Sequence, residues 1–375
     1  MGFLLLLLLS AVGLSFASDG GLLFRPRFEH AEARNDGLKP ANALTFRLAL
    51  WKEGFQNPLG FRFELTAVGV LLDRFYPQRE GYAKVAEENR LRPTELYAYY
   101  RTRFLELRAG RFRVRLGDER LIGSVDWRQM PQTFDAVALF FSEAPWKFEA
   151  YYLLARKGVL NSLSTDAGED GPFNRSPVLV FSLKPTGGFE FSAYYLDLSE
   201  VSETGGAFLG WEGKRLSLFF DYAVQRGGTS GDWASMVRAW VRLGPLTAGF
   251  ERLKPSFTTP LATLHRFNGY ADAFLAYTAS SNDWGLWDLY ATAVFKTSAG
   301  RAEVSLHRFR SVRRLPTGGR DFGRELDLVW TFPLLKNLSL GLKAALYEPD
   351  GEGCDLFYCR RTFRFWLWST FAFSF

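Results

Sequence analysis

The chain has 375 residues, of which 17% are Phe, Tyr or Trp, and its formal net charge is +6. Charged residues make up 23% of the sequence, which excludes an intrinsically disordered chain, and two cysteines exclude a disulfide-dense scaffold. After the N-terminus no apolar run approaches the ~18 residues of a spanning helix, so a helical membrane protein is excluded, and the mild charge gives no indication of nucleic-acid binding.

The first predicted element is an export signal. Residues 1–17 form an apolar stretch too short to span a bilayer, and Ser15 and Ala17 put small residues at the −3 and −1 positions of a cleavage site. No positive residue precedes the stretch, so a wrongly assigned start or an N-terminal anchor is the alternative. We expect residues 1–17 to be a signal peptide and residues 18–375 to form one domain.

Apolar and polar residues alternate with period two along most of the remaining chain, which predicts strands. In residues 44–50, for example, Leu and Phe alternate with Thr, Arg and Ala. We expect about 18 strands, each near the ~9–11 residues that cross a bilayer as a tilted strand. Their expected ranges are 22–30, 43–51, 60–72, 95–101, 104–112, 133–141, 146–155, 178–184, 189–196, 206–212, 215–224, 233–243, 246–252, 286–295, 301–309, 324–332, 338–346 and 362–375.

The connections between these strands alternate in length. Every second connection is a short turn with Gly, Pro or small polar residues: 102–103, 143–145, 185–188, 244–245 and 297–300. The connections between them are long: 73–94, 113–132, 156–177, 253–285, 310–323 and 347–361. This alternation of short and long connections predicts an all-β fold. We expect an antiparallel up-and-down transmembrane β-barrel in the outer membrane, with short periplasmic turns and long extracellular loops.

Two features near the C-terminus add to this interpretation. An alternating last strand that ends in Phe375 resembles the signal by which the outer-membrane assembly machinery recognises its clients. Cys354 and Cys359 lie close together in one loop, and in an oxidising compartment we expect them to form a local disulfide. The aromatic residues are expected in the two girdles of the barrel; filling of a soluble β core is the alternative.

The polar face of each strand is expected to line the lumen, and it is rich in arginine. The arginines predicted to face the pore are Arg25, Arg27, Arg47, Arg62, Arg108, Arg238 and Arg242. Rings of arginine with interspersed acids favour anionic or sugar-like solutes, because the guanidinium fork pairs with carboxylates and phosphates. Alternatively, the arginines and acids satisfy each other and select nothing.

Two motifs resemble the alginate-export family of outer-membrane porins. They are GRFRVRLGDERLIGSVDWRQMPQTFDA at residues 110–136 and TPLATLHRFNGYADAFL at residues 259–275, followed by GLWDLY at 285–290. The resemblance implies a monomeric barrel that passes an anionic polysaccharide or smaller solutes by diffusion, although members are diverse and alginate itself is not implied. Carried onto this sequence, it implicates Arg111, Asp118, Arg120, Trp127, Arg128, Gln129, Asp135, His265, Arg266, Asn268 and Asp272. The sequence departs from the family pattern at Phe112, Met130, Pro131 and Tyr270.

Both motifs fall in predicted long loops or where these loops meet strands. We expect residues 113–132 to fold inward as a constriction that presents Arg115, Arg120 and Arg128 to the solute, and residues 253–285 to form a second plug. The alternative is that the loops lock the barrel mouth, with pairs such as Arg128 and Asp126 as braces.

Two other classes of function are weighed against the channel. An outer-membrane hydrolase has a candidate pair in His265 and Asp272, but no GxSxG or HExxH motif is present, and no spacing suits a metal or a nucleotide cofactor. An adhesin or structural barrel would need a lumen closed by large apolar residues. The arginine-bearing inward faces favour a channel, with no enzyme activity and no cofactor expected.

Overall fold

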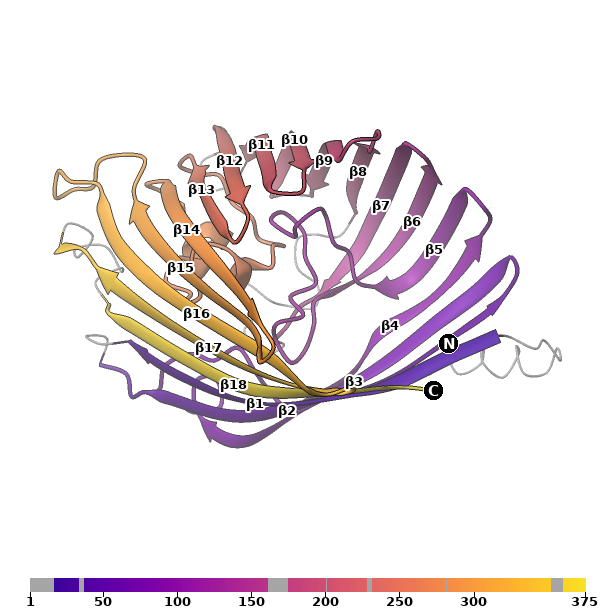
Figure 1. Cartoon of the computed structure of the whole chain (residues 1–375), viewed down its shortest axis with the longest axis horizontal. Coiled ribbons are helices and arrows are strands. Elements are labelled where there is room, and N and C mark those ends of the chain that lie inside the picture. Colours follow the sequence, from indigo (N-terminus) through magenta and orange to yellow (C-terminus); the bar gives the residue numbers. More distant parts are fainter. Residues whose placement is uncertain are drawn as a thin grey trace.

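The computed structural model describes residues 17–33, 37–160, 175–199, 201–227, 231–280, 282–351 and 360–375. In this part of the chain, one antiparallel sheet of 18 strands closes on itself because β1 pairs with both β2 and β18 (Figure 1). No helix among these residues is long and apolar enough to cross a membrane. The predicted signal peptide lies almost entirely outside the described residues, as do Cys354 and Cys359.

Each of the 18 predicted strands overlaps an observed one, and the predicted fold class is confirmed. The strands are β1 (Ala17–Ala33), β2 (Ala41–Gln56), β3 (Leu59–Arg74), β4 (Arg90–Arg101), β5 (Leu105–Phe112), β6 (Thr133–Glu143), β7 (Trp146–Lys157), β8 (Ser176–Leu183), β9 (Phe189–Leu198), β10 (Ser202–Glu212), β11 (Leu216–Gly227), β12 (Trp233–Leu243), β13 (Leu246–Leu253), β14 (Leu286–Thr297), β15 (Gly300–Arg310), β16 (Asp321–Leu335), β17 (Leu338–Pro349) and β18 (Thr362–Ser374).

The alternation along each strand separates a lumen face from a lipid face. In β2, Thr45 and Arg47 are buried, whereas Leu48 and Leu50 are 39% and 46% exposed. A closed barrel with large apolar side chains on its outside and charged ones inside is the arrangement that a bilayer requires, because lipid cannot solvate a charge.

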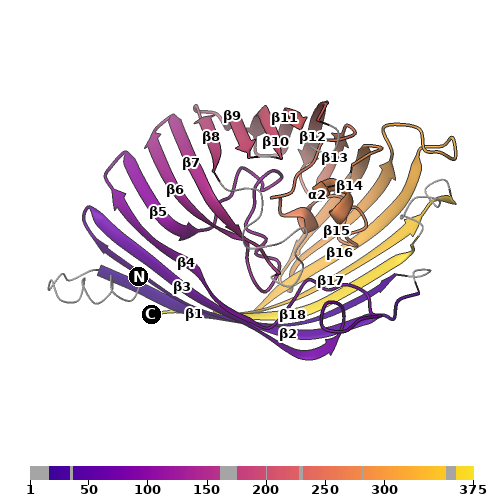
Figure 2. The ribbon, with the colours of Figure 1, turned by 180° about the vertical axis from the view of Figure 1, so that it is seen from behind.

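Two long loops leave the barrel wall and fold into the lumen (Figures 1 and 2). We call residues 113–132, between β5 and β6, the constriction loop. Residues 254–285, between β13 and β14, form the second loop, which contains the short helices η1 (Leu264–Arg266) and α2 (Leu275–Ser280). The two loops touch through a bridge between Ile122 and Leu261. The inward folding predicted for residues 113–132 is thus observed.

An apolar core lies inside the barrel where the second loop packs against the wall. Phe257, Phe274 and Leu261 of the loop are fully buried, together with Phe309 of β15 and Phe322 at the start of β16. The Phe274 and Phe309 ring centroids are 4.6 Å apart. Apolar packing therefore closes part of the lumen.

Candidate functional site

Arginines of the first strand hold the constriction loop across the lumen. The guanidinium of Arg25 donates to the carbonyl oxygens of Asp126 and Arg128, at 3.0 and 2.7 Å, and to Oε1 of Gln129 at 3.0 Å. Arg27 donates to the carbonyl oxygen of Trp127 at 2.5 Å. Because these acceptors are consecutive backbone and side-chain groups, the alternating arginines of β1 fix the course of the loop.

Buried carboxylates from distant segments pair with the arginines of the loop. Arg128 lies 3.2 Å from Glu29 of β1 and 3.4 Å from Asp272 of the second loop. Arg120 makes a bidentate pair with Glu251 of β13, at 2.6 and 2.8 Å, and is only 1% exposed. In such surroundings each charge depends on its partner, so these pairs act as braces between loops and wall.

One carboxylate on the constriction loop, that of Asp126, lies close to three arginines. Asp126 lies 3.3 Å from Arg113 and 3.5 Å from Arg47, and it also pairs with Arg115. Burial by itself would raise the pKa of Asp126, but these three cations hold the pKa at about 2. Asp126 is therefore ionised throughout the physiological range and neutralises part of the arginine charge at the loop.

Glu87 lies in the connection between β3 and β4 and is a second buried anchor for the loop. It pairs with Arg27 and accepts hydrogen bonds from the backbone N–H of Gln129 at 3.1 and 3.2 Å. Burial raises the pKa of Glu87 above its ordinary value, in spite of the neighbouring arginines. Glu87 therefore holds the constriction loop from a position that solvent does not reach.

Aromatic rings join the two inward loops to the wall, and we call Trp127, His265, Tyr270, Lys343 and Trp366 the aromatic latch. The His265 imidazole stacks on Trp127 at 5.0 Å, and Lys343 Nζ of β17 lies 3.8 Å from the centre of the Trp127 ring and 3.7 Å from that of Tyr270. Such contacts between an ammonium and ring faces are worth about 2 kcal/mol when desolvated.

The hydrogen bonds of His265 require a neutral ring. Its Nδ1 lies 2.7 Å from Asp272 and its Nε2 lies 3.1 Å from Lys343 Nζ. An ammonium can only donate, so Nε2 is the acceptor and Nδ1 donates to the carboxylate. Burial lowers the pKa of His265 to about 3, although the nearby Asp272 opposes the shift.

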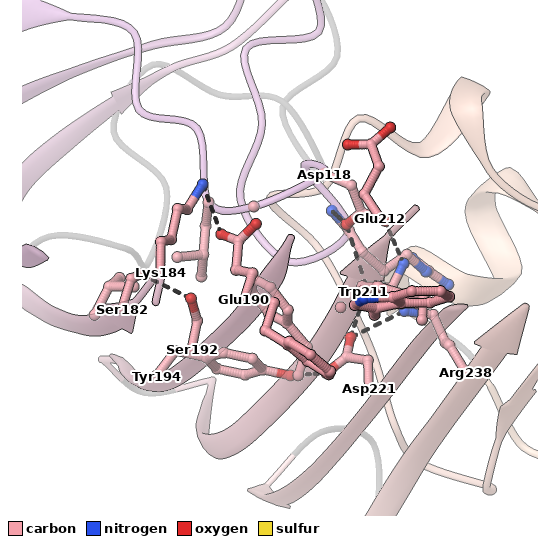
Figure 3. A pocket seen from close by; sticks show the side chains of 18 of the residues that line it. Asp118, Ser182, Lys184, Glu190, Ser192, Tyr194, Trp211, Glu212, Asp221 and Arg238 are labelled. Atoms are coloured by element: carbon pink, nitrogen blue, oxygen red, sulfur yellow. Dashed lines mark hydrogen bonds and ion pairs between the residues drawn. The ribbon is translucent and has the colours of Figure 1, made fainter. Parts of the chain in front are cut away.

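The open part of the lumen is a cavity of about 970 Å³ that we call the vestibule (Figure 3). Its walls come from β7 to β12 and it reaches the short turn at residues 184–188, so it extends to the periplasmic end. The constriction loop lines its inner end with Arg115, Asp118 and Arg120. Five arginines line it: Arg115, Arg120, Arg238, Arg242 and Arg266.

The vestibule combines charged groups with an aromatic wall. Arg238 lies 2.7 Å from Asp118 and 2.6 Å from Asp221, and these three side chains converge in Figure 3. Phe219 and Trp240 are stacked, with ring centroids 5.5 Å apart and an angle of 9° between their planes. A ligand in this space meets flat ring faces and guanidinium groups together.

A second cavity of about 180 Å³ borders the vestibule and has the opposite charge. The two share Asp118, Arg238 and Arg266, but the far wall of the smaller one carries acids from β14 to β16. These acids are Asp288, Glu303 and Asp327. Arginines on one side and acids on the other produce a transverse field across the lumen, which is a feature that orients polar solutes. Among the described residues, no group of His, Cys, Asp and Glu side chains is arranged to hold a metal ion.

Most of the residues predicted from the sequence fall into three sets. Those at the vestibule or the smaller cavity are Arg115, Asp118, Arg120, Arg238, Arg242, Arg266 and Asn268. Those engaged in bracing contacts around the loops are Arg25, Arg27, Arg47, Trp127, Arg128, Gln129, His265 and Asp272. Arg62 pairs within the wall, with Glu53 of β2 at 3.1 Å and Glu95 of β4 at 2.6 Å. Arg108 lies nearer the periplasmic end, where it pairs with Glu106 at 2.6 Å.

The third set does not face the lumen. Arg111 and Asp135 pair at 2.7 Å on the outer side of β5 and β6, because the next residues, Phe112 and Phe134, are fully buried inside. Their placement corrects the expectation that both belong to the pore. The reason is the strand period: one residue separates the lumen face from the lipid face.

Several partners in the site were not predicted. Glu87, Glu251 and Lys343 are buried against the loops, and Trp240 forms part of the vestibule wall. Lys343 could have been found, since it is the single charged residue within 338–346, a segment of otherwise apolar and small residues. Glu87 lies in a polar loop, and its sequence neighbours give no signal of burial.

A closed 18-strand barrel with large apolar side chains outside and long loops folded into its lumen is the architecture of an outer-membrane channel. The family model described as alginate export matches residues 17–204, half of the chain, and the protein belongs to this family. The resemblance seen in the sequence is thereby confirmed. No curated protein matches the chain.

Solved structures share the fold at low sequence identity. Acinetobacter baumannii OccAB4 is 13% identical with a TM-score of 0.74, over 96% of this chain and 98% of that one. Pseudomonas aeruginosa OccK3 (OpdO) is 15% identical with a TM-score of 0.70, over 96% of each chain. P. aeruginosa OpdK, solved with vanillate, is 14% identical with a TM-score of 0.71, over 96% of this chain and 100% of that one.

Proposed function

We propose that this protein is a monomeric diffusion channel for small anionic solutes, including sugar acids, with selectivity set in the vestibule. The observation that carries the proposal is the pairing of exposed arginines with ring faces in one cavity of about 970 Å³. The side chain of Arg115 is 50% exposed and that of Arg242 is 43% exposed, so both can reach a solute. Their fork geometry suits a carboxylate, and Phe219 and Trp240 offer flat surfaces to a ring.

The buried arginines have a different role in this proposal. Arg120 and Arg128 are 1% and 5% exposed and are saturated by acids, so they position the constriction loop and do not contact the solute. The exposed arginines then determine which solutes pass. The buried arginines stabilise the constriction loop in its position inside the lumen. The vanillate in the OpdK structure is a small ring carboxylate, which supports this choice of solute class.

A polysaccharide is the second candidate, favoured by the description of the family as alginate export. The constriction loop weighs against free passage of a polymer, because Arg25, Arg27 and Arg120 fix it at widely spaced points. For a polymer to pass, these bonds would have to break. A small solute needs no such rearrangement.

Single-channel recordings in planar bilayers test the proposal. We expect a conducting pore that prefers anions, and a reversal potential that shifts towards cations when Arg115 and Arg242 are both replaced by Gln. Arg301→Gln is the matched control, because this arginine is also half exposed but does not line the vestibule. A pore without conductance, or one whose reversal potential the double variant leaves unchanged, would contradict the proposal.

Permeation of solutes of increasing size separates the two candidates. Proteoliposomes should admit a monomeric uronate faster than the corresponding neutral sugar, and should exclude a uronate polymer. Polymer uptake at a rate similar to that of the monomer would favour the polysaccharide. His265 is 3% exposed and committed to Asp272 and Lys343, which supports a protein without hydrolase activity.

We also propose that residues 1–17 are removed on export, that residues 18–375 form the single mature domain, and that Phe375 contributes to recognition by the assembly machinery. In the folded barrel the backbone of Phe375 pairs with that of Gly20 at 3.0 and 2.9 Å, beside the seam between β1 and β18. Mass spectrometry of the purified protein, with and without reduction, tests the cleavage site and the disulfide between Cys354 and Cys359.

A further inference from the structure

A dense cluster of arginines lies at the extracellular end of β15 and β16, far from the vestibule. Residues 308–324 contain six arginines and a single carboxylate, Asp321. We call Arg308, Arg310, Arg313, Arg314, Arg320 and Arg324 the arginine rim, and all six are exposed. They flank or belong to the loop at residues 311–320, which is on the long-loop side of the barrel.

The strand members of this rim point away from the lumen. Leu306 and Leu326, two residues before Arg308 and two after Arg324, are 58% and 46% exposed on the outer surface. Phe309 and Glu325, which directly follow Arg308 and Arg324 on the opposite face of the same strands, are buried. Because side chains alternate with period two, Arg308 and Arg324 stand on the lipid-facing side, at the upper edge of the apolar band.

Trp287 marks the height of this edge. It faces outward, pairs in register with Arg310, and its ring lies 5.5 Å from the guanidinium of Arg252. Tryptophan on the outside of a barrel is typical of the level at which lipid headgroups begin. The arginine rim therefore lies at headgroup height, where a phosphate of the outer leaflet would meet it.

The arginines at this edge lie close to one another and outnumber the acids of their own segment, residues 308–324. Arg308 and Arg324 are direct cross-strand neighbours, an arrangement that places their Cβ atoms about 5 Å apart and destabilises a sheet when the two side chains carry like charges. Asp321 is shared between Arg308, at 2.8 Å, and Arg310, at 3.4 Å, while Asp350 is 3.9 Å from Arg308. Glu348 lies opposite Arg324 in register, and its ion pair, at 2.9 Å, is with Arg361.

We propose that the arginine rim binds a multiply phosphorylated lipid headgroup of the outer leaflet. Arginine forks pair with phosphate oxygens through charge-assisted hydrogen bonds, and an anion between Arg308 and Arg324 removes their mutual repulsion. The adjacent leucines contact the acyl chains of the same lipid. A soluble phosphate would gain nothing from that apolar surface, so the lipid is the occupant. This inference is independent of the solute that the channel passes.

Titration of the purified full-length barrel with lipid A tests the inference. The readout is the temperature at which the folded barrel unfolds in detergent, followed by its heat-dependent mobility on gels. The rim variant carries Arg308→Gln, Arg310→Gln and Arg324→Gln. The matched control carries Lys214→Gln, Arg215→Gln and Lys336→Gln, which remove three exposed cations at the periplasmic turns.

Lipid A should raise the unfolding temperature of the wild-type protein and of the control variant alike. Since each basic residue near an anionic membrane surface contributes roughly a fivefold change in affinity, the rim variant should bind on the order of a hundredfold more weakly. Equal binding by the rim variant would overturn the inference.

Two comparisons with the wild-type protein alone keep the test decisive if the variant does not fold. Dephosphorylated lipid A should stabilise the barrel much less than the bis-phosphorylated form, and equal stabilisation would overturn the proposed recognition of phosphate. Inorganic pyrophosphate should neither stabilise the barrel nor compete with lipid A at the same concentration. If it does either, the rim binds a free anion and the lipid is not its ligand.

Discussion

Replacement of Arg120 by Ala tests whether the buried arginines are braces. In the wild-type protein the Arg120 guanidinium pairs with Glu251 at 2.6 and 2.8 Å and donates to Thr259 at 2.6 Å. Glu251, which is 4% exposed in the wild-type protein, loses the guanidinium in the variant. It keeps the hydrogen bond that Asn268 donates at 3.2 Å. Removal of one partner from a buried ion pair typically costs about 3–5 kcal/mol.

The loss should act first on the constriction loop, because Arg120 belongs to that loop and Glu251 to the wall. We expect the narrowed state to become unstable relative to one in which the loop has left β13. Single-channel recordings should then show new states of higher conductance, and urea unfolding in lipid vesicles should begin at a lower concentration. Because the ion pairs of Arg115 are exposed to solvent, we expect Arg115→Ala to lower the free energy of unfolding by less than about 1 kcal/mol.

A double-mutant cycle measures the pair itself. If Glu251→Gln is combined with Arg120→Ala, the double variant should be less destabilised than the sum of the two single variants, since the uncompensated buried charge is gone. Arg120 is not a brace if Arg120→Ala costs less than about 1 kcal/mol, leaves the conductance unchanged and adds independently to Glu251→Gln.

Two further predictions concern the loops. His265 is neutral in the folded latch, where its pKa is about 3, but it takes up a proton near its ordinary pKa of 6.5 once the latch opens. The free energy of closing the latch should therefore become less favourable as the pH falls from about 6.5 towards 3, by about 1.4 kcal/mol per pH unit. His265→Gln should abolish the resulting dependence of conductance on pH. Asp126 has a lowered pKa of about 2 against an ordinary 3.8, so its stabilisation is complete above about pH 4 and is lost as the pH falls through 2. Asp126→Asn should remove that loss and shift the reversal potential towards anions; an unshifted potential would place its charge out of reach of the permeating ions.

The strands and their connections were predictable because each depends on local sequence. In a strand with lipid on one side and the polar lumen on the other, apolar and polar side chains must alternate. Leu48 faces the lipid and Arg47 the lumen, as the residue types predict. Arg111 and Asp135 were assigned to the pore by the family resemblance and not by this rule, because a motif gives the residues but not the face. Their neighbours Phe112 and Phe134 occupy the lumen side.

The sequence by itself determined a closed barrel, the parity of its loops and an arginine-rich interior, because these follow from the period and spacing of residues close together in the chain. Only the tertiary structure decided which arginines are free to meet a solute. Arg128 finds Glu29 across 99 residues and Asp272 across 144, whereas Arg115 keeps half of its side chain exposed at the vestibule. An arginine is neutralised or left available by the partners that folding brings to it, and those partners lie in segments whose sequences carry no mark of the pairing.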